Sequence, residues 1–155
     1  MSHDGSALYL AAGISIFRIH PEHLGLDTVI EVLPVFPDNL RPHPNGQTYL
    51  LGTGVKRAKP FSIAALFEPF PLLRTLLARF LPIHAILELV PPFGGIIELD
   101  LDGSEAIVNH WQDNTGLVRH VSGAQCHGEY MYLGTWHEGY LARVNLANLP
   151  GFHHS

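Results

Sequence analysis

Cysteine is nearly absent from this sequence. Cys126 is the single cysteine among 155 residues, so no intrachain disulfide can form. Charged residues make up only 15% of the chain while hydrophobic residues make up 46%, which excludes a disordered chain. Positive charge is scarce: nine Lys and Arg against 14 Asp and Glu leave a formal net charge of −5. No nucleic-acid partner is expected, because binding phosphates requires a basic face.

Long apolar runs and familiar metal motifs are also missing from the sequence. No run reaches the roughly 18 apolar residues that a membrane helix needs. The apolar run 7–17 has the length of a signal sequence, but residues 1–6 carry Asp4 and no basic residue. We therefore expect no cleavage and a cytoplasmic location. The 11 histidines are scattered without H-E-x-x-H or C-x-x-C spacing, so no zinc site is predicted.

Three segments repeat one pattern, which consists of a turn, an aromatic and aliphatic strand, and a glycine. They are residues 4–13, 45–52 and 127–134. The Asp-Gly and Asn-Gly pairs that open the first two supply the left-handed residues of a tight turn. Each repeat is followed by a second strand, at 14–19, 96–101 and 140–146 respectively. In each of these strands a charged residue alternates with apolar ones: Arg18, Glu98 and Arg143. This pattern predicts that each strand has one solvated face, on which its charged residue lies.

Repeated hairpin units of this kind are typical of a β-propeller, in which a blade takes roughly 40–50 residues. The sequence therefore predicts an all-β fold: a single half-propeller domain, 1–155, of about three four-stranded blades. The expected blades are 1–36, 37–113 and 114–155. Closed propellers have roughly four to eight blades, so three would leave open sheet edges. A homodimer that completes a six-bladed ring would cover those edges.

A short helical insertion, 55–92, interrupts the second expected blade. It starts with basic residues and contains a stretch, 72–81, whose apolar side chains fall on one helical face. Prolines divide it into two short helices, with Ser62 as the candidate N-cap of the first. We favour a lid that packs on the propeller. Membrane or partner contact through 61–81 is the alternative.

Several segments resemble parts of a known family. Residues 2–9 resemble its S-P-D-G-x-x-L-Y strand opening, and 33–41 its L-P-G-F-P-D-N-I-R segment. Residues 125–134 with 139–146 resemble its final E-H-D-G-x-L-Y-L-G and Y-L-x-R-x-x-L pair. The chain is thus similar to the C-terminal half of the strictosidine synthase-like family. Its insertion is similar to that of the adipocyte plasma membrane-associated type. The family belongs with the paraoxonases and gluconolactonases among six-bladed, calcium-dependent propellers.

The resemblance implies a metal role for Asp38 and Asn39. In paraoxonase-type relatives the Asp-Asn pair of this motif reaches the central Ca²⁺, and carboxylate and amide oxygens are ligands that calcium prefers. The same two residues after Pro37 are also typical of a turn, and both interpretations stay open. Calcium takes about six to eight oxygens, so water or a second chain would supply the others.

The resemblance also places His120 at the histidine of the His-x-Glu pair of strictosidine synthases, whose glutamate is the general base. Ser122 replaces that glutamate, so true strictosidine synthase activity is not expected. His120 remains the candidate catalytic residue, as a group that orients a substrate. A strand-end histidine with a satisfied hydrogen bond is the alternative. His127 matches the histidine of the family's E-H-D-G turn, whereas Cys126 replaces the acidic residue before it and Gly128 the Asp after it. Cys126 is expected to be a small buried hydrophobe rather than a nucleophile.

The resemblance implies a calcium-dependent esterase or lactonase that acts on a small molecule when the chain assembles as a homodimer. Two alternatives stay open. One is a non-catalytic ligand-binding or scaffold half-propeller. The other is a truncated gene relic that folds by self-association and has no selected activity.

Overall fold

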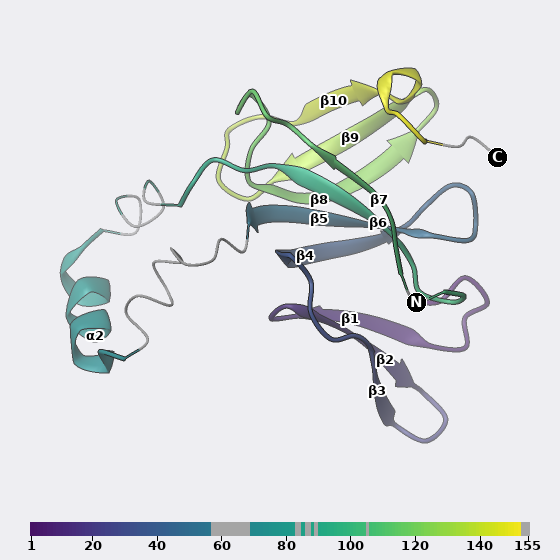
Figure 1. The fold of residues 1–155 in the computed structure, drawn as a ribbon, viewed down its shortest axis with the longest axis horizontal. Helices are drawn as coiled ribbons and strands as arrows, with labels where there is room; N and C mark the ends of the chain where they lie inside the picture. Colours follow the sequence, from purple (N-terminus) through teal and green to yellow (C-terminus); the bar gives the residue numbers. More distant parts are fainter. Residues whose placement is uncertain (57–68, 83–84, 86–87, 89, 105, 153–155) are drawn as a thin grey trace.

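The computed structural model consists mainly of β-strands, which form three antiparallel sheets in chain order (Figure 1). It describes residues 1–56, 69–82, 85, 88, 90–104 and 106–152. The first sheet contains β1 (Leu8–Ala12), β2 (Ser15–His20) and β3 (Gly25–Ile30). The second contains β4 (Val35–Pro42), β5 (Tyr49–Lys56), β6 (Gly95–Asp100) and β7 (Ala106–Gln112). The third contains β8 (Val121–His127), β9 (Tyr130–Thr135) and β10 (Ala142–Asn145). The predicted all-β fold, a partial propeller of consecutive blades, is confirmed.

The three sequence repeats adopt the same local structure at β1, β5 and β9. The glycine of each preceding turn has a positive φ, at 79° for Gly5, 68° for Gly46 and 57° for Gly128. Glycine tolerates this region because it has no Cβ. In the first two turns a side-chain oxygen, from Asp4 and Asn45, accepts a backbone N–H two residues later at 2.9 Å. The turns predicted from the sequence are therefore confirmed.

The equivalent strands do not occupy equivalent positions in their sheets. β5 and β9 are the second strands of their sheets, after β4 and β8, whereas β1 is at the edge of the first sheet. The first strands of the three sheets are β1, β4 and β8. β4 packs against both β1 and β8, so these first strands lie side by side. Among the described residues, only the second sheet has the four strands expected of a blade.

Two hydrophobic clusters join the sheets, and β5 and β6 contribute to both. Alternate side chains of a strand point to opposite faces. Tyr49 and Leu51 therefore enter the cluster against the first sheet, while Leu50 enters the cluster against the third. Burial on both faces makes the second sheet the centre of the described structure.

This double burial contradicts the predicted solvated face at Glu98. Glu98 is only 4% exposed, and its two carboxylate oxygens accept hydrogen bonds from the Thr48 hydroxyl at 2.6 Å and the Asn109 amide at 2.7 Å. These bonds compensate the desolvation of the carboxylate. The alternating pattern could not reveal this, because the third sheet covers the face that a lone sheet would expose.

The helix expected at 72–81 is present as α2 (Pro71–Phe80), with Pro71 in its first turn. It does not pack as the predicted lid: Leu72 is 80% exposed and Phe80 is 74% exposed, and Figure 1 shows α2 to one side of the sheets. The first predicted helix and its cap, Ser62, lie outside the described residues. No helix in the described part is long and apolar enough to cross a membrane.

Candidate functional site

His120 lies immediately before β8, at the junction of three segments. Its φ of 53° is uncommon for a residue with a side chain. Its backbone is held on both sides: the N–H donates to Phe93 O at 2.7 Å, and the carbonyl accepts from Trp136 N at 3.1 Å. These bonds tie the start of β8 to the segment before β6 and to the loop after β9. A strained conformation at such a junction is typical of functional positions.

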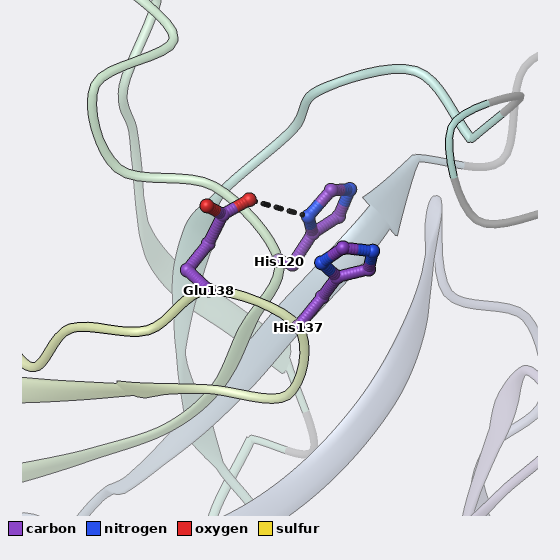
Figure 2. Close-up of side chains that lie close together, drawn as sticks. All are labelled: His120, His137 and Glu138. Carbon is purple, nitrogen blue, oxygen red and sulfur yellow. Dashed lines mark hydrogen bonds and ion pairs between the residues drawn. The ribbon is translucent and has the colours of Figure 1, made fainter. Parts of the chain in front are cut away.

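The imidazole of His120 is buried among aromatic rings. The residue is 5% exposed, and its ring centroid lies 4.9 Å from that of Trp136. The ring of His137, which Figure 2 shows beside it, has its centroid at 5.6 Å. Its Nδ1 lies 3.1 Å from Oε1 of Glu138. Its Nε2 is buried and has no hydrogen-bond partner among the described residues. One ring nitrogen is therefore oriented by a carboxylate, and the other is available to a ligand.

The position of Glu138 is fixed by an ion pair with Arg119 and by a hydrogen bond within its own loop. The Arg119 Nε lies 3.0 Å from Oε1, and Arg119 Nη2 lies 3.3 Å from Oε2. The Thr135 hydroxyl donates to the backbone carbonyl of Glu138 at 3.1 Å, which closes the turn after β9. A carboxylate positioned in this way can fix the tautomer and orientation of an imidazole.

A cavity of about 320 Å³ opens beside these groups. Its lining includes Glu88, Pro92, Arg119, His120, His137 and Glu138. The volume is at the small end of known ligand sites. The arrangement can perform acid–base chemistry on a small polar molecule, with one histidine oriented by a carboxylate and one arginine beside it.

His137 and Glu138 were not predicted as site residues from the sequence. Ser122, two residues after His120, was expected to leave the site without its acid–base carboxylate. That position does lack a carboxylate, but the structure places a different one beside His120: Glu138, from the loop after β9. The sequence signal for these two site residues was the Trp-His-Glu triplet Trp136–Glu138, which follows the third repeat. Only the return of the β8–β9 hairpin brings that triplet back to His120.

Asp38 and Asn39 lie in a β-bulge of β4 rather than in a turn. Pro37 pairs with Thr53 and Leu40 pairs with Leu51, so two residues of β4 face one residue of β5. Both side chains are exposed. Desolvation raises the pKa of Asp38, and its carboxylate has no hydrogen bond or ion pair with any described residue. The bulge explains why the pair interrupts a strand without ending it.

The bulge lies against β8. A Cβ added to Gly123 would be 3.2 Å from Asn39 Cβ, and a Cβ added to Gly52 would be 2.3 Å from Ser122 O. These glycines therefore permit the close approach of β4 and β5 to β8. The structure brings the predicted calcium ligands to the strand that follows His120, but no hydrogen bond or ion pair joins them to His120.

Cys126 is partly buried in β8. Burial, together with the charge of Glu98, raises the pKa of the Cys126 thiol to about 11. A thiol in this state is a poor nucleophile, which agrees with the expected packing role. His127 pairs with Tyr130 at the end of the same hairpin, where it precedes the turn glycine.

Comparisons with known proteins identify relatives along most of the chain. The adipocyte plasma membrane-associated protein of Danio rerio is 31% identical over 138 residues, which cover 86% of this chain and 33% of the relative. The protein of the same name from Gallus gallus is 32% identical over 127 residues, covering 81% and 30%. The protein from Homo sapiens is 29% identical over 124 residues, covering 79% and 29%.

The chain spans about a third of the length of the curated relatives it matches. No family model and no solved structure matches it. The relatives nevertheless match the resemblance that the motifs predicted, including its adipocyte plasma membrane-associated type. The chain is therefore a homologue of part of the adipocyte plasma membrane-associated proteins, which supports the resemblance to the strictosidine synthase-like family.

Proposed function

We propose that this chain contributes the acid–base site of a calcium-dependent esterase or lactonase. The observation that carries the proposal is the pair of buried His120 and partly buried Glu138, whose Nδ1 and Oε1 lie 3.1 Å apart beside a cavity. A carboxylate that accepts a hydrogen bond from Nδ1–H keeps the proton on Nδ1 and so leaves the lone pair of the imidazole on Nε2. The Nε2 of His120 has no partner among the described residues, so it can accept a proton.

Hydrolysis would use His120 twice. Nε2 takes a proton from water as the water oxygen bonds to the acyl carbon, and returns that proton to the leaving alkoxide as the ester C–O bond breaks. Glu138 stabilises the imidazolium that exists between these two steps. A general base of this kind contributes roughly 10²- to 10⁴-fold to the rate.

The residues at the β4 bulge fit a calcium ion. Asp38 and Asn39 are hard oxygen donors, and the Asp38 carboxylate lacks a described cationic or hydrogen-bonding partner. A calcium ion there would polarise a substrate carbonyl and stabilise the oxyanion. Water or further protein groups would complete its coordination.

The proposal includes a homodimer that completes a six-bladed ring. β1 occupies the edge of the first sheet, and its Leu8 and Leu10 are 41% and 47% exposed. Exposed leucines on one face of an outer sheet favour packing against another sheet. Light scattering on a size-exclusion column, with and without Ca²⁺, measures the assembly; a mass near twice 17.1 kDa supports a dimer. A folded monomer in both conditions would contradict the dimer.

The activity is tested with aryl esters and lactones on the purified chain. We expect His120→Asn to lower kcat by roughly 10²-fold or more, whereas His23→Asn, a substitution at an exposed histidine, leaves it unchanged. Ca²⁺ should raise the Tm of the parent chain but not that of Asp38→Asn. Absence of turnover with the calcium effect retained would sink the enzyme proposal and favour a non-catalytic binding module.

A further inference from the structure

Two imidazoles and one carboxylate converge at the cavity beside β8. His120, His137 and Glu138 each offer a ligand atom, and the three atoms lie within 4.8 Å of one another (Figure 2). In a tetrahedral zinc site the ligands lie about 2.0–2.2 Å from the metal, which places them roughly 3.3–3.6 Å apart. The 3.1 Å between His120 Nδ1 and Glu138 Oε1 is already close to that spacing. Small side-chain rotations would suffice to enclose an ion.

A second observation concerns the other nitrogen of the same ring. His120 Nε2 is buried in a residue that is 5% exposed, and it has no partner among the described residues. A buried polar atom without a partner is costly, and native structures usually supply one. A metal ion would supply a partner if it binds Nε2.

We infer that His120, His137 and Glu138 form a site for a divalent transition-metal ion of the Zn²⁺ class. The adjoining cavity of about 320 Å³ leaves room for water as the fourth ligand. This site differs in chemistry from the bulge of β4, because imidazole nitrogen selects zinc and its neighbours while carboxylate and amide oxygens select calcium. The chain therefore has two candidate metal sites of different selectivity.

Arg119 opposes metal binding at this site. Its guanidinium lies 3.0 Å and 3.3 Å from the two oxygens of Glu138, so it competes with a cation for the same carboxylate. Arg119 is partly exposed, with a side-chain exposure of 44%, and can move aside. Removing its charge with Arg119→Gln should therefore strengthen metal binding. A merely structural His–Glu pair has no reason to respond in this way.

Metal binding at this site does not depend on the proposed hydrolysis, but it is expected to affect it. A metal ion on His120 takes the lone pair that a general base needs. Zn²⁺ is therefore expected to inhibit any ester hydrolysis, while Ca²⁺ supports it. If hydrolysis is absent, the metal site can still be measured by direct binding. The two proposals therefore fail separately.

The test is a Co²⁺ titration followed by its d–d absorption, with Zn²⁺ affinity measured by competition against a chromophoric chelator. The chain is used without a histidine tag. His153 and His154 are replaced by Asn in every variant, because adjacent histidines bind metals by themselves. We expect one ion per chain and the intense visible bands of tetrahedral Co²⁺. Inorganic Ca²⁺ at the same concentration should not displace the cobalt.

The decisive variant is His137→Asn, since His137 is only partly buried and its loss should leave the fold intact. It should weaken Zn²⁺ binding roughly 10- to 100-fold or more, and Arg119→Gln should strengthen it. Two controls should bind as the parent does: His23→Asn, which removes the stacked His20–His23 pair, and Asp38→Asn. Equal affinity in the parent and in His137→Asn, or loss of binding in His23→Asn, would overturn the inference. Far-UV circular dichroism and Tm confirm that each variant is folded.

Discussion

Oε1 of Glu138 lies 3.1 Å from Nδ1 of His120, although 18 residues and the turn of a β-hairpin separate them in the chain. The contact joins the start of β8 to the loop after β9. It fixes the orientation of the buried His120 ring. The second ring nitrogen, Nε2, then has no hydrogen-bond partner among the described residues. Acid–base chemistry and metal binding both depend on this one relationship.

The first prediction concerns that pair. Glu138→Gln should lower kcat for ester hydrolysis by roughly 10²-fold, with a smaller change in KM, because the amide cannot stabilise an imidazolium. Residues that act as a unit are not additive. The double variant with His120→Asn should therefore be no slower than His120→Asn alone, as measured by steady-state kinetics. Additive losses in the double variant would show that the two residues act independently.

The second prediction separates close packing from backbone conformation at two glycines. Gly52→Ala should destabilise the fold by more than about 2 kcal/mol, because its Cβ would lie 2.3 Å from the backbone oxygen of Ser122. Gly46→Ala has open space around its Cβ and carries only the cost of a positive φ, about 1 kcal/mol. Urea unfolding of both variants measures the difference. Equal losses would contradict the close approach of β5 and β8.

A third prediction concerns Asp102, which joins the first two sheets. It accepts hydrogen bonds from the hydroxyls of Tyr9 and Tyr49, the latter at 2.7 Å. Tyr49 is 1% exposed, so losing this acceptor leaves a buried hydroxyl with one bond fewer. Asp102→Ala should cost about 1–3 kcal/mol of stability by chemical denaturation.

The control for this prediction is Tyr49→Phe, which removes the buried donor. If the hydrogen bond is the cause, Asp102→Ala should cost less in a Tyr49→Phe background than in the parent chain. An unchanged cost would assign the effect of Asp102 to other contacts.

The fourth prediction concerns the reactivity of Cys126. Burial, with the nearby charge of Glu98, raises the thiol pKa from 9.0 to about 11. At pH 8 the native thiolate is then about 100-fold rarer than in the unfolded chain, and alkylation by iodoacetamide should be slower by at least that factor. The rate should rise as the pH approaches 11.

The same shift has a consequence for stability. A thiol whose folded pKa is raised stabilises the fold at pH below 9.0, and that contribution is lost as the pH rises toward about 11. Cys126→Ala should therefore remove part of the loss of stability between these pH values. A native alkylation rate equal to that of the unfolded chain at pH 8 would refute the prediction.

Features that depend on near neighbours could be predicted from the sequence. The turns at Gly5 and Gly46 follow from Asp-Gly and Asn-Gly, because those residues adopt or support left-handed φ values locally. The apolar spacing of 72–81 predicts α2 for the same reason, since a helix is built from contacts three and four residues apart. Three repeated turn–strand units then indicate consecutive blades, because each unit folds in the same way wherever it occurs in the chain.

Burial and the assembly of the site depend on how the sheets pack against one another, and only the tertiary structure decided them. Periodicity predicted a solvated Glu98, but packing of the third sheet on the second buries it. Periodicity also predicted a covered apolar face on α2, where Leu72 and Phe80 are exposed. The site is the clearest case: spacing along the chain pointed to Ser122 and a missing carboxylate, whereas the hairpin of β8 and β9 returns Glu138 to His120. Residue preferences act over a few residues, while such contacts arise only when packed sheets bring distant loops together.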